Sequence, residues 1–436
     1  MRKSSLFILG FFAFFLSALM VLVWASNRYD GWSKVRVTSF YVPDQATYEA
    51  LANQDWGIPA AEDLTALPTY LQNSLAWLAE SQAADGGWGA GLHAHQNIRD
   101  PHAVATDPAT TALAAMAILR AGSTLSDGPY RTNLNAATEY LLSATEGADH
   151  RALNITELEA TQPQTKLGDN VDVALAAQYF ARLTPYLADA GPTYQRITAA
   201  LDRCIAMIEA AQLDDGSWST RGWARVLNSS MSNNALELAE RVGRPVNRDI
   251  LERSQNYQRG NVYADGSVRT ESAAGVPLYA LSSCQRATAS SANTTRQALA
   301  SEMQQTQDTL SQSLAVEALQ RQGYAEEEAN QMAADYIANV QAARQVLTDD
   351  VQRGFGNNGG EEFLSHMLTS ESLAALGGEN WDNWYLRMNE LYSDIQNSNS
   401  SWSGHHCITS PVFCTAAVVM AVTADREPKA LMAVNG

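Results

Sequence analysis

One short turn recurs along this 436-residue chain, and it constrains the fold more than any other sequence feature. Each copy is a polar turn of Asp or Asn with Gly or Ser, in the better copies ending in Trp, and a helix-forming segment rich in Ala or other small residues follows. The copies begin at Asp85, Asp215, Asp265 and Asn399, the third of them without a Trp. A repeated turn-to-helix junction indicates a series of helical hairpins, because each unit buries its apolar side only against its neighbours.

The segments between these turns are of two kinds, and the two kinds alternate. Segments such as 109–121 and 415–424 are apolar nearly all round, which is typical of a helix buried on every side. Segments such as 64–83 and 193–211 have the pattern of outer helices, which bury one face only. This alternation predicts six pairs of helices in two concentric rings, with the more apolar helix of each pair inside.

The expected architecture is therefore all-α, a single (α/α)6 toroid over residues 64–425. A polar helix at about residues 294–321 is expected as an insertion between two pairs. Residues 27–63 are expected to form a spacer with a short strand near 35–42, and residues 426–436 a tail.

The first 26 residues differ from the rest. Arg2 and Lys3 precede an uninterrupted apolar run over residues 6–25, which is long enough to cross a bilayer at about 20 residues. Positive charge ahead of the run predicts a cytoplasmic N-terminus and export of the remainder. We expect an uncleaved signal anchor over residues 1–26 that holds the toroid on the extracytoplasmic, periplasmic side of the membrane. A cleaved signal peptide ending near Ala25 is the alternative.

Composition argues against one class of partner. Apolar residues make up 46% of the chain and charged residues 17%, which is typical of a globular protein rather than a disordered one. The formal net charge is -18. Because no positive charge is spare for phosphate groups, a nucleic-acid partner is not expected.

Export also bears on the cysteines. Cys407 and Cys414 lie close together in and after the last turn, and an oxidising compartment predicts a disulfide between them. The alternative is thiol chemistry, in which a cysteine beside a histidine acts as a nucleophile or a zinc ligand. The pairing of Cys204 and Cys284 stays open.

Two of the turns extend into longer similar sequences. Residues 81–88 read Ser-Gln-Ala-Ala-Asp-Gly-Gly-Trp, and residues 211–218 read Ala-Gln-Leu-Asp-Asp-Gly-Ser-Trp. This Gln…Asp-Gly-x-Trp pattern resembles the repeats of the squalene–hopene cyclase and protein prenyltransferase superfamily. The resemblance covers roughly residues 64–425. It implies an α/α toroid in which each repeat ties an outer helix to the next inner helix, with any ligand in the mouth of the ring.

The catalytic motifs of that superfamily are not reproduced. Its cyclases open an inner helix with Asp-x-Asp-Asp, whose third residue protonates an alkene, and the stretch that resembles this motif runs from Asp169 to Asp172 with Val171 in third place. A valine cannot donate a proton, so cyclase chemistry is not expected. The prenyltransferases hold zinc with an Asp-x-Cys pair, which this sequence lacks. We therefore expect neither reaction and no metal site, and the sequence identifies no cofactor.

Two groups of residues are the candidates for chemistry. Glu362 and His366 lie four residues apart on one helix face and could serve as a base and a proton carrier. His405 and His406, in the last turn, are expected to face them across the mouth. The alternative is that Glu362 belongs to an acidic first helical turn that stabilises the helix dipole, with His366 as a buried polar residue.

Five further residues are expected to bind a ligand at the mouth without reacting with it. They are Asp107, Asp169, Asp172, Trp381 and Trp402. The alternative for an aspartate that begins a helix is an N-cap, and the alternative for Trp381 and its aromatic neighbours is ordinary packing.

Three functions fit this pattern. The first is a membrane-anchored toroid that binds a lipid, an isoprenoid or a partner protein in its mouth, without cyclase or zinc prenyltransferase chemistry. The second is a lipid-modifying enzyme that uses the glutamate and histidines just named. The third is a glycan-active (α/α)6 barrel, with one carboxylate from Asp169 or Asp172 facing another from Glu361 or Glu362. The sequence leaves open whether the chain is an enzyme.

Overall fold

The computed structural model describes residues 54–59, 66–187, 191–263, 265–300, 311–354, 356 and 358–432. All of these belong to one compact unit, Asp44–Gly436. The predicted anchor over residues 1–26 and the predicted strand near 35–42 lie outside the described residues. Among the helices of the described ranges, none combines the length and the apolar character needed to cross a membrane.

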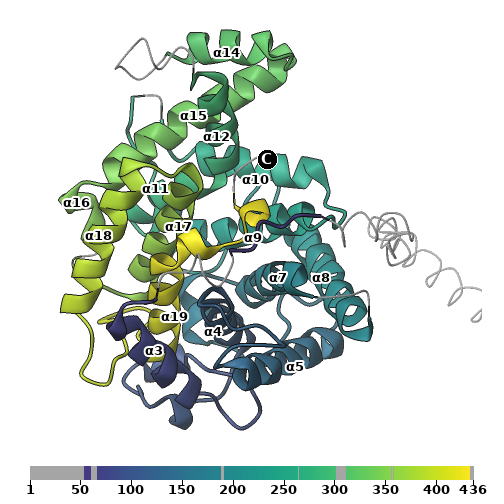
Figure 1. The fold of residues 1–436 in the computed structure, drawn as a ribbon, viewed down its shortest axis with the longest axis vertical. Helices are drawn as coiled ribbons and strands as arrows, with labels where there is room; N and C mark the ends of the chain where they lie inside the picture. Colours follow the sequence, from purple (N-terminus) through teal and green to yellow (C-terminus); the bar gives the residue numbers. More distant parts are fainter. Residues whose placement is uncertain are drawn as a thin grey trace, which may run out of the picture. The chain divides into compact units, whose positions relative to one another are not determined.

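Six helices form a closed inner ring (Figure 1). Each contacts the next along the chain, and the last contacts the first, so the ring has no open edge. Almost every residue of these helices is buried, as expected for an inner ring. The six are α4 (Pro108–Arg120), α7 (Val171–Leu183), α9 (Arg225–Arg241), α11 (Pro277–Ala287), α17 (Gly360–Leu376) and α19 (Pro411–Val422).

Six further helices pack against the outside of this ring and bury one side only. In the first of them the buried residues Leu71, Ser74, Leu75 and Leu78 recur every three or four positions, the period of one helix face. The contacts therefore produce the all-α double ring that the sequence predicts. The six are α3 (Thr69–Glu80), α5 (Arg131–Gly147), α8 (Pro192–Ala211), α10 (Arg248–Arg259), α15 (Glu326–Val346) and α18 (Glu379–Asp394).

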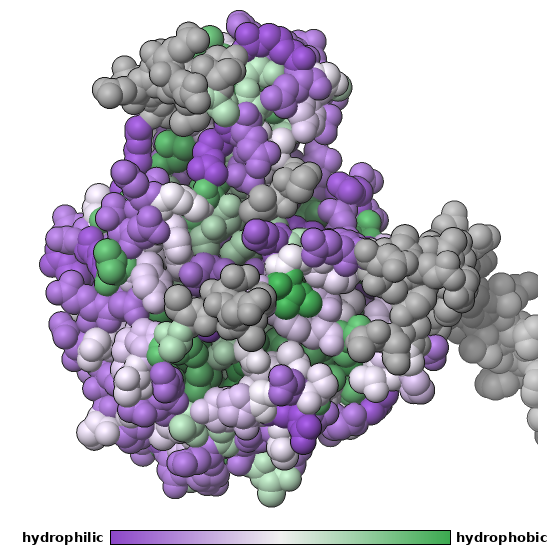
Figure 2. All heavy atoms as spheres, in the orientation of Figure 1, coloured by the Kyte–Doolittle hydropathy of each residue, from purple (hydrophilic) through white to green (hydrophobic). Residues whose placement is uncertain are grey.

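The insertion between α11 and α15 differs from the prediction. In place of one helix at 294–321, the described residues contain α12 (Ala289–Ala298) and α14 (Gln312–Arg321), and residues 301–310 between them are not described. These two helices pack with α15 around a small apolar core of their own. The coloured surface of this part is mostly hydrophilic (top of Figure 2).

The recurrent turn ties an outer helix to the inner helix that follows it, through the tryptophan. Each indole Nε1 donates a hydrogen bond to a carbonyl in the last turn of the outer helix, where the helix has no N–H of its own to offer. The three pairs are Trp88 with Leu78 O (2.8 Å), Trp218 with Ile208 O (2.7 Å) and Trp402 with Tyr392 O (2.9 Å).

The backbone N–H of the same tryptophan serves the other helix. It donates to a hydroxyl of the inner helix, which is Thr111 for the first copy, Ser229 for the second and Thr415 for the third, at 2.9, 3.2 and 3.0 Å. Trp402, predicted to bind a ligand, is therefore a buried residue of the junction, with 1% of its surface exposed.

A glutamine in each of these copies extends the tie to a second outer helix. Its Nε2 donates to a carbonyl of the next outer helix around the ring. The pairs are Gln82 with Asn133 O of α5, Gln212 with Ile250 O of α10 and Gln396 with Tyr70 O of α3, at 2.9, 2.8 and 3.2 Å. The third pair joins the last outer helix to the first and so closes the outer ring.

Glycine is required within the turn for two reasons. Gly86 and Gly216 have φ of 89° and 86°, in the left-handed region that side chains disfavour. A Cβ at Gly86 would also lie 2.5 Å from the carbonyl oxygen of Ala136. Ser400 takes the same place in the last copy with φ of 67°, so that copy keeps the left-handed conformation with a residue that disfavours it.

We expect Trp218→Phe to lower the free energy of unfolding by about 1–3 kcal/mol, because the buried Ile208 carbonyl loses its hydrogen-bond donor. The control is Trp223→Phe, the same change at an indole that is 53% exposed, which should shift the free energy by less than about 0.5 kcal/mol. Urea unfolding followed by circular dichroism compares the two variants. Equal losses at both positions would contradict the role given to the buried indole.

Candidate functional site

The inner helices run in one direction, so the two ends of the ring differ chemically. We call the end where they begin the mouth, and the end where they finish the base. At the mouth, Gln162 of α6 (Gln162–Lys166) donates to the Ala90 carbonyl ahead of α4 at 2.8 Å. It also accepts from the Thr409 N–H ahead of α19 at 2.6 Å. The loops that precede three inner helices, α4, α7 and α19, therefore meet at this one side chain.

Glu361, in the first turn of α17, is a buried carboxyl at this end of the ring. Its Oε2 accepts from the Ile408 N–H at 3.2 Å, while Oε1 has no hydrogen-bond partner and the residue has no exposed surface. Burial, and then the neighbouring charge of Glu362, raise the pKa of Glu361 to about 7. Glu361 can therefore carry a proton at neutral pH.

Glu362 is held in a different way. The Tyr279 hydroxyl of α11 donates to its Oε1 at 2.6 Å, and the Gly359 N–H donates to its Oε2 at 2.8 Å. These two bonds fix the position of the carboxylate. The second bond lets the Glu362 side chain satisfy the N-cap N–H at the start of α17, and Glu361 and Glu362 form the acidic first turn given as the alternative.

Lys166 and Trp223 complete the polar and aromatic groups of the mouth. The Lys166 ammonium lies 5.2 Å from the centre of the Trp223 ring, within cation–π range. Backbone bonds fix the pair, because the N–H groups of Trp223 and Ala224 both donate to the Lys166 carbonyl at 2.8 Å. The positive charge of Lys166 also acts against the rise in the pKa of Glu361.

Sequence reasoning missed this pair. Trp223 is 53% exposed, whereas Trp88, Trp218 and Trp402 are almost wholly buried. It follows the repeat tryptophan Trp218 closely and carries no motif that sets it apart. The one available signal was an additional Trp, outside the repeat pattern, directly ahead of an inner helix.

The structure brings two of the predicted residues together. A Cβ at Gly359 would lie 3.0 Å from the His406 ring and 3.0 Å from Glu362 Oε2, so His406 and Glu362 meet over this glycine. His405 is exposed, and its backbone N–H donates to the Asn358 carbonyl at 2.8 Å. The last turn therefore does reach the start of α17, as expected.

His366 does not join this group. It is buried between α17 and α18, where its Nδ1 lies 3.0 Å from the Tyr392 hydroxyl and its ring meets Trp384 edge-on at 5.9 Å. Burial lowers the pKa of His366 to about 4, so the ring is neutral at physiological pH. It is the buried polar residue of the alternative interpretation, not a partner of Glu362 at the mouth.

The predicted aspartates hold loops and helix ends. Asp107 caps α4 by accepting from the Thr110 N–H at 2.8 Å, and it also accepts from the Ala90 N–H. Asp172 accepts from the Ile155 N–H at 2.9 Å, and burial raises its pKa to about 7.

Asp169 and Trp381 are likewise placed by packing. Asp169 lies at the mouth with its Oδ1 3.7 Å from Arg221, but Asn170, in the left-handed conformation, takes the N-cap position of α7. Trp381 is on the outer helix α18, 9% exposed, with its ring 5.6 Å from that of Tyr385. It belongs to the main apolar core.

The predicted disulfide is not formed in the structure. Cys407 and Cys414, like Cys204 and Cys284, are free thiols. The Cys414 thiol points at the Ile408 carbonyl, 3.7 Å away. Burial raises the pKa of Cys407 to about 12 and that of Cys414 further, so neither is a thiolate nucleophile. Among the described residues no group of three or more His, Cys, Asp or Glu is arranged to hold a metal ion.

Comparison with known proteins gives remote structural similarity only. No family model matches the sequence, and no curated protein matches it. Similar solved structures include the α-1,6-mannanase GH76A of Salegentibacter sp. HEL1_6, at 11% identity and a TM-score of 0.48, covering 85% of this chain and 99% of that one. Its inactive variant in complex with α-1,6-mannotriose gives 10% identity and a TM-score of 0.47 over the same shares.

A type II terpene cyclase, MstE from Scytonema, in complex with merosterolic acid A, is also similar, at 13% identity and a TM-score of 0.45, covering 82% of this chain and 96% of that one. Similarity at this level says nothing about the residues of the mouth.

The raised pKa of Glu361 makes a prediction about pH. The pKa of this carboxyl is about 7 in the folded protein and about 4.3 in the unfolded chain. Its contribution to the free energy of unfolding is therefore fully present below about pH 4.3 and is lost as the pH rises through about 7. Glu361→Gln, which is permanently neutral, should therefore gain about 2–3 kcal/mol relative to wild type between pH 5 and pH 8.

Urea unfolding of both proteins at the two pH values measures this difference. Glu139→Gln, at a carboxylate that is 65% exposed, is the control and should give no comparable change. A wild-type-to-Glu361→Gln difference that stays constant with pH would contradict the neutral carboxyl.

Proposed function

We propose that the mouth of this toroid binds a carbohydrate. The observation that carries the proposal is the exposed indole of Trp223 beside Lys166 and a buried carboxyl with an unpartnered oxygen, Glu361. A flat apolar ring at the rim can take the apolar face of a sugar, and a few converging polar groups can take its hydroxyls. Glu361 Oε1 is a hydrogen-bonding group without a protein partner, and the half-buried Lys166 supplies a donor.

A lipid fits this ring less well. The interior positions of the inner helices are filled by their own side chains, which are almost all buried. The two pockets at the base have room of only about 0 and 20 Å³, and arginines and glutamates are prominent in their lining. Pockets that enclose small molecules usually measure about 300–1,000 Å³ and are mainly apolar. The polar, partly exposed mouth favours a hydroxyl-rich ligand over an isoprenoid.

Glycoside hydrolysis is the second candidate, and the pKa of Glu361 favours it. An acid with a pKa of about 7 can give a proton to the leaving glycosidic oxygen at neutral pH. Water would then add its hydroxyl to the anomeric carbon, and its remaining proton would pass to a neighbouring carboxylate such as Glu362, which the Tyr279 hydroxyl and the Gly359 N–H hold in place. In this scheme Glu361→Gln abolishes hydrolysis while leaving carbohydrate binding in place.

We expect Trp223→Ala to weaken binding of any oligosaccharide that the wild-type protein retains by at least about tenfold, which corresponds to the loss of about 1.4 kcal/mol of ring contact. A glycan array identifies the oligosaccharide, and isothermal titration measures the affinity. The matched control is Leu386→Ala, at a residue of α18 that is 67% exposed, which should bind as wild type does. Undiminished binding by Trp223→Ala would remove the mouth from consideration.

We also propose that residues 1–26 anchor the toroid to a membrane with the mouth outside the cytoplasm, on the strength of the apolar run behind Arg2 and Lys3. The full chain should stay in the membrane pellet after alkaline carbonate extraction, and a chain that begins at Asn27 should be released. Recovery of the full chain in the soluble fraction would contradict the anchor.

A further inference from the structure

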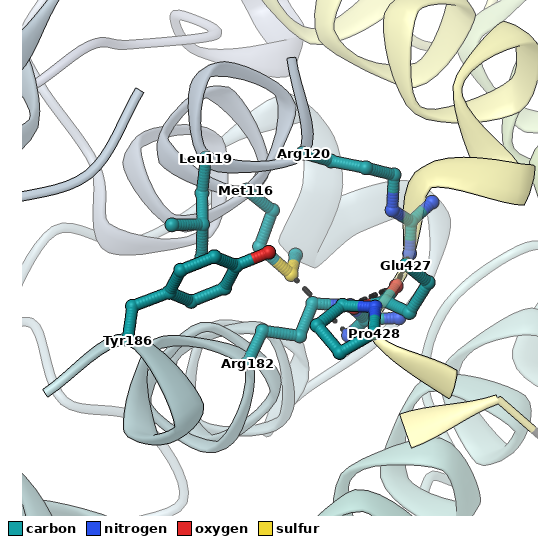
Figure 3. Close-up of a pocket in the computed structure, with 7 residues that line it drawn as sticks. All are labelled: Met116, Leu119, Arg120, Arg182, Tyr186, Glu427 and Pro428. Atoms are coloured by element: carbon teal, nitrogen blue, oxygen red, sulfur yellow. Dashed lines mark hydrogen bonds and ion pairs between the residues drawn. The ribbon is translucent and has the colours of Figure 1, made fainter. Parts of the chain in front are cut away.

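Charged residues from five parts of the chain converge at the base, and Figure 3 shows three of them, Arg120, Arg182 and Glu427. We call them the base cluster, and their charges are buried, with side-chain exposures between 2% and 7%. The three arginines come from the C-terminal turns of α4, α7 and α11, where the negative end of each helix dipole favours a cation. The members are Arg120, Arg182, Arg286, Glu371 and Glu427.

Glu371 of α17 is a fixed part of this cluster. Its two carboxylate oxygens lie 2.8 Å from Arg120, 2.9 Å from Arg182 and 3.1 Å from Arg286. The three guanidinium groups hold the pKa of Glu371 well below its usual range. Because a helix of the inner ring carries it, Glu371 cannot leave without disturbing the ring.

Glu427 completes the cluster from outside the ring helices. It lies beyond α19, on the segment that follows the short turn Ala424–Arg426. The Arg182 Nε donates to its Oε2 at 3.0 Å, and Arg120 donates to the same oxygen. The segment is tied down close by through its backbone, since the Leu431 carbonyl accepts from Arg241 at 2.6 Å and the Lys429 N–H donates to the Gly57 carbonyl at 3.2 Å.

Two small pockets border Glu427, and its side chain and the arginines nearly fill them. The first is lined by Arg120, Arg182, Tyr186 and Glu427, which Figure 3 shows, and has no room for a water molecule. The second, lined by Arg182, Arg286, Glu371 and Glu427, has room of about 20 Å³. The buried Arg120 Nε has no hydrogen-bond partner among the described residues. The arginines are thus not fully used by the two glutamates.

The charge balance makes Glu427 the replaceable member. Two residues of α9 extend the cluster. Glu237 pairs with Arg286 at 2.9 Å, and Arg241 pairs with Glu237 at 3.8 Å. Four arginines then meet three glutamates, and without Glu427 four would meet two. Removing a carboxylate from buried guanidinium groups strongly destabilises the fold, because it leaves uncompensated buried charge. The vacated position would therefore attract another carboxylate.

We propose that the base of the ring is a binding site for a small carboxylate, and that Glu427 fills this site in cis. An incoming carboxylate takes the place of the Glu427 side chain between Arg120 and Arg182. The segment after α19 then loses its main polar attachment to the ring. This site is independent of the carbohydrate site proposed at the mouth.

The test compares full-length wild type with Glu427→Ala, using acetate as the probe at constant ionic strength. Glu427→Ala should unfold several degrees below wild type, and acetate should raise its midpoint in a saturable manner towards the wild-type value. Acetamide has the same shape without the charge and should have no effect. Wild type and Glu146→Ala, which removes an exposed partner of Arg196, should not respond to acetate.

Two results would overturn the proposal. Equal stabilisation by acetamide would mean that the additive only fills space, and an equal acetate response in wild type would mean that Glu427 does not occupy the site. Should Glu427→Ala fail to fold, Glu427→Gln keeps the side-chain volume without the charge. Calorimetry should then show that Glu427→Gln binds acetate at least tenfold more tightly than wild type does, and equal affinities would contradict the cis carboxylate.

Discussion

The hydrogen bond from a buried indole to the last turn of an outer helix is the interaction on which the ring depends. An outer helix ends with carbonyls that lack an intrahelical donor, and burying them unpaired would be costly. Trp88, Trp218 and Trp402 supply that donor while their backbone N–H groups bind the next inner helix. One residue thus fixes both the end of one helix and the position of the next. The glutamine of the same turn then passes the constraint to the neighbouring outer helix.

The two ends of the ring use the same residue type in opposite ways. Glu361 and Glu371 stand on one face of α17, since the intervening positions 364 and 368 keep the helical spacing. At the mouth, burial and then the charge of Glu362 raise the pKa of Glu361 to about 7. At the base, Glu371 meets three guanidinium groups, so its pKa falls. The surroundings of the two glutamates make Glu361 a proton carrier and Glu371 a permanent anion. The mouth is therefore polar and the base is ion-paired.

Sequence reasoning reached the fold because the fold is built from local, repeated chemistry. The Gln…Asp-Gly-x-Trp turns and the alternation of helix types needed no knowledge of distant contacts. Helix boundaries were less accessible: α11 begins only at Pro277, because Ala274 and Gly275 just ahead of it have positive φ.

The site was harder to predict because it depends on which residues meet across the ring. Glu362 and His366 share a helical spacing, yet Glu362 bonds across to α11 while His366 turns outward to α18. Residue spacing along one helix does not show which of the two neighbouring helices each side chain contacts. Trp223 and Lys166 could be recognised only once the structure placed an exposed indole beside a cation. The disulfide prediction for Cys407 and Cys414 was wrong because their proximity in sequence did not bring the sulfurs into a bond.

The bond between Gln396 and Tyr70 joins residues that are 326 positions apart. The first outer helix, α3, therefore has no neighbour on one side until almost the whole chain has been made. During synthesis the apolar face of α3 lacks part of its native contacts, and the ring can close only in a late step between residues far apart in the sequence. We therefore expect the pairing of the first outer helix with the last, rather than the formation of any single helix, to be the slow step of folding.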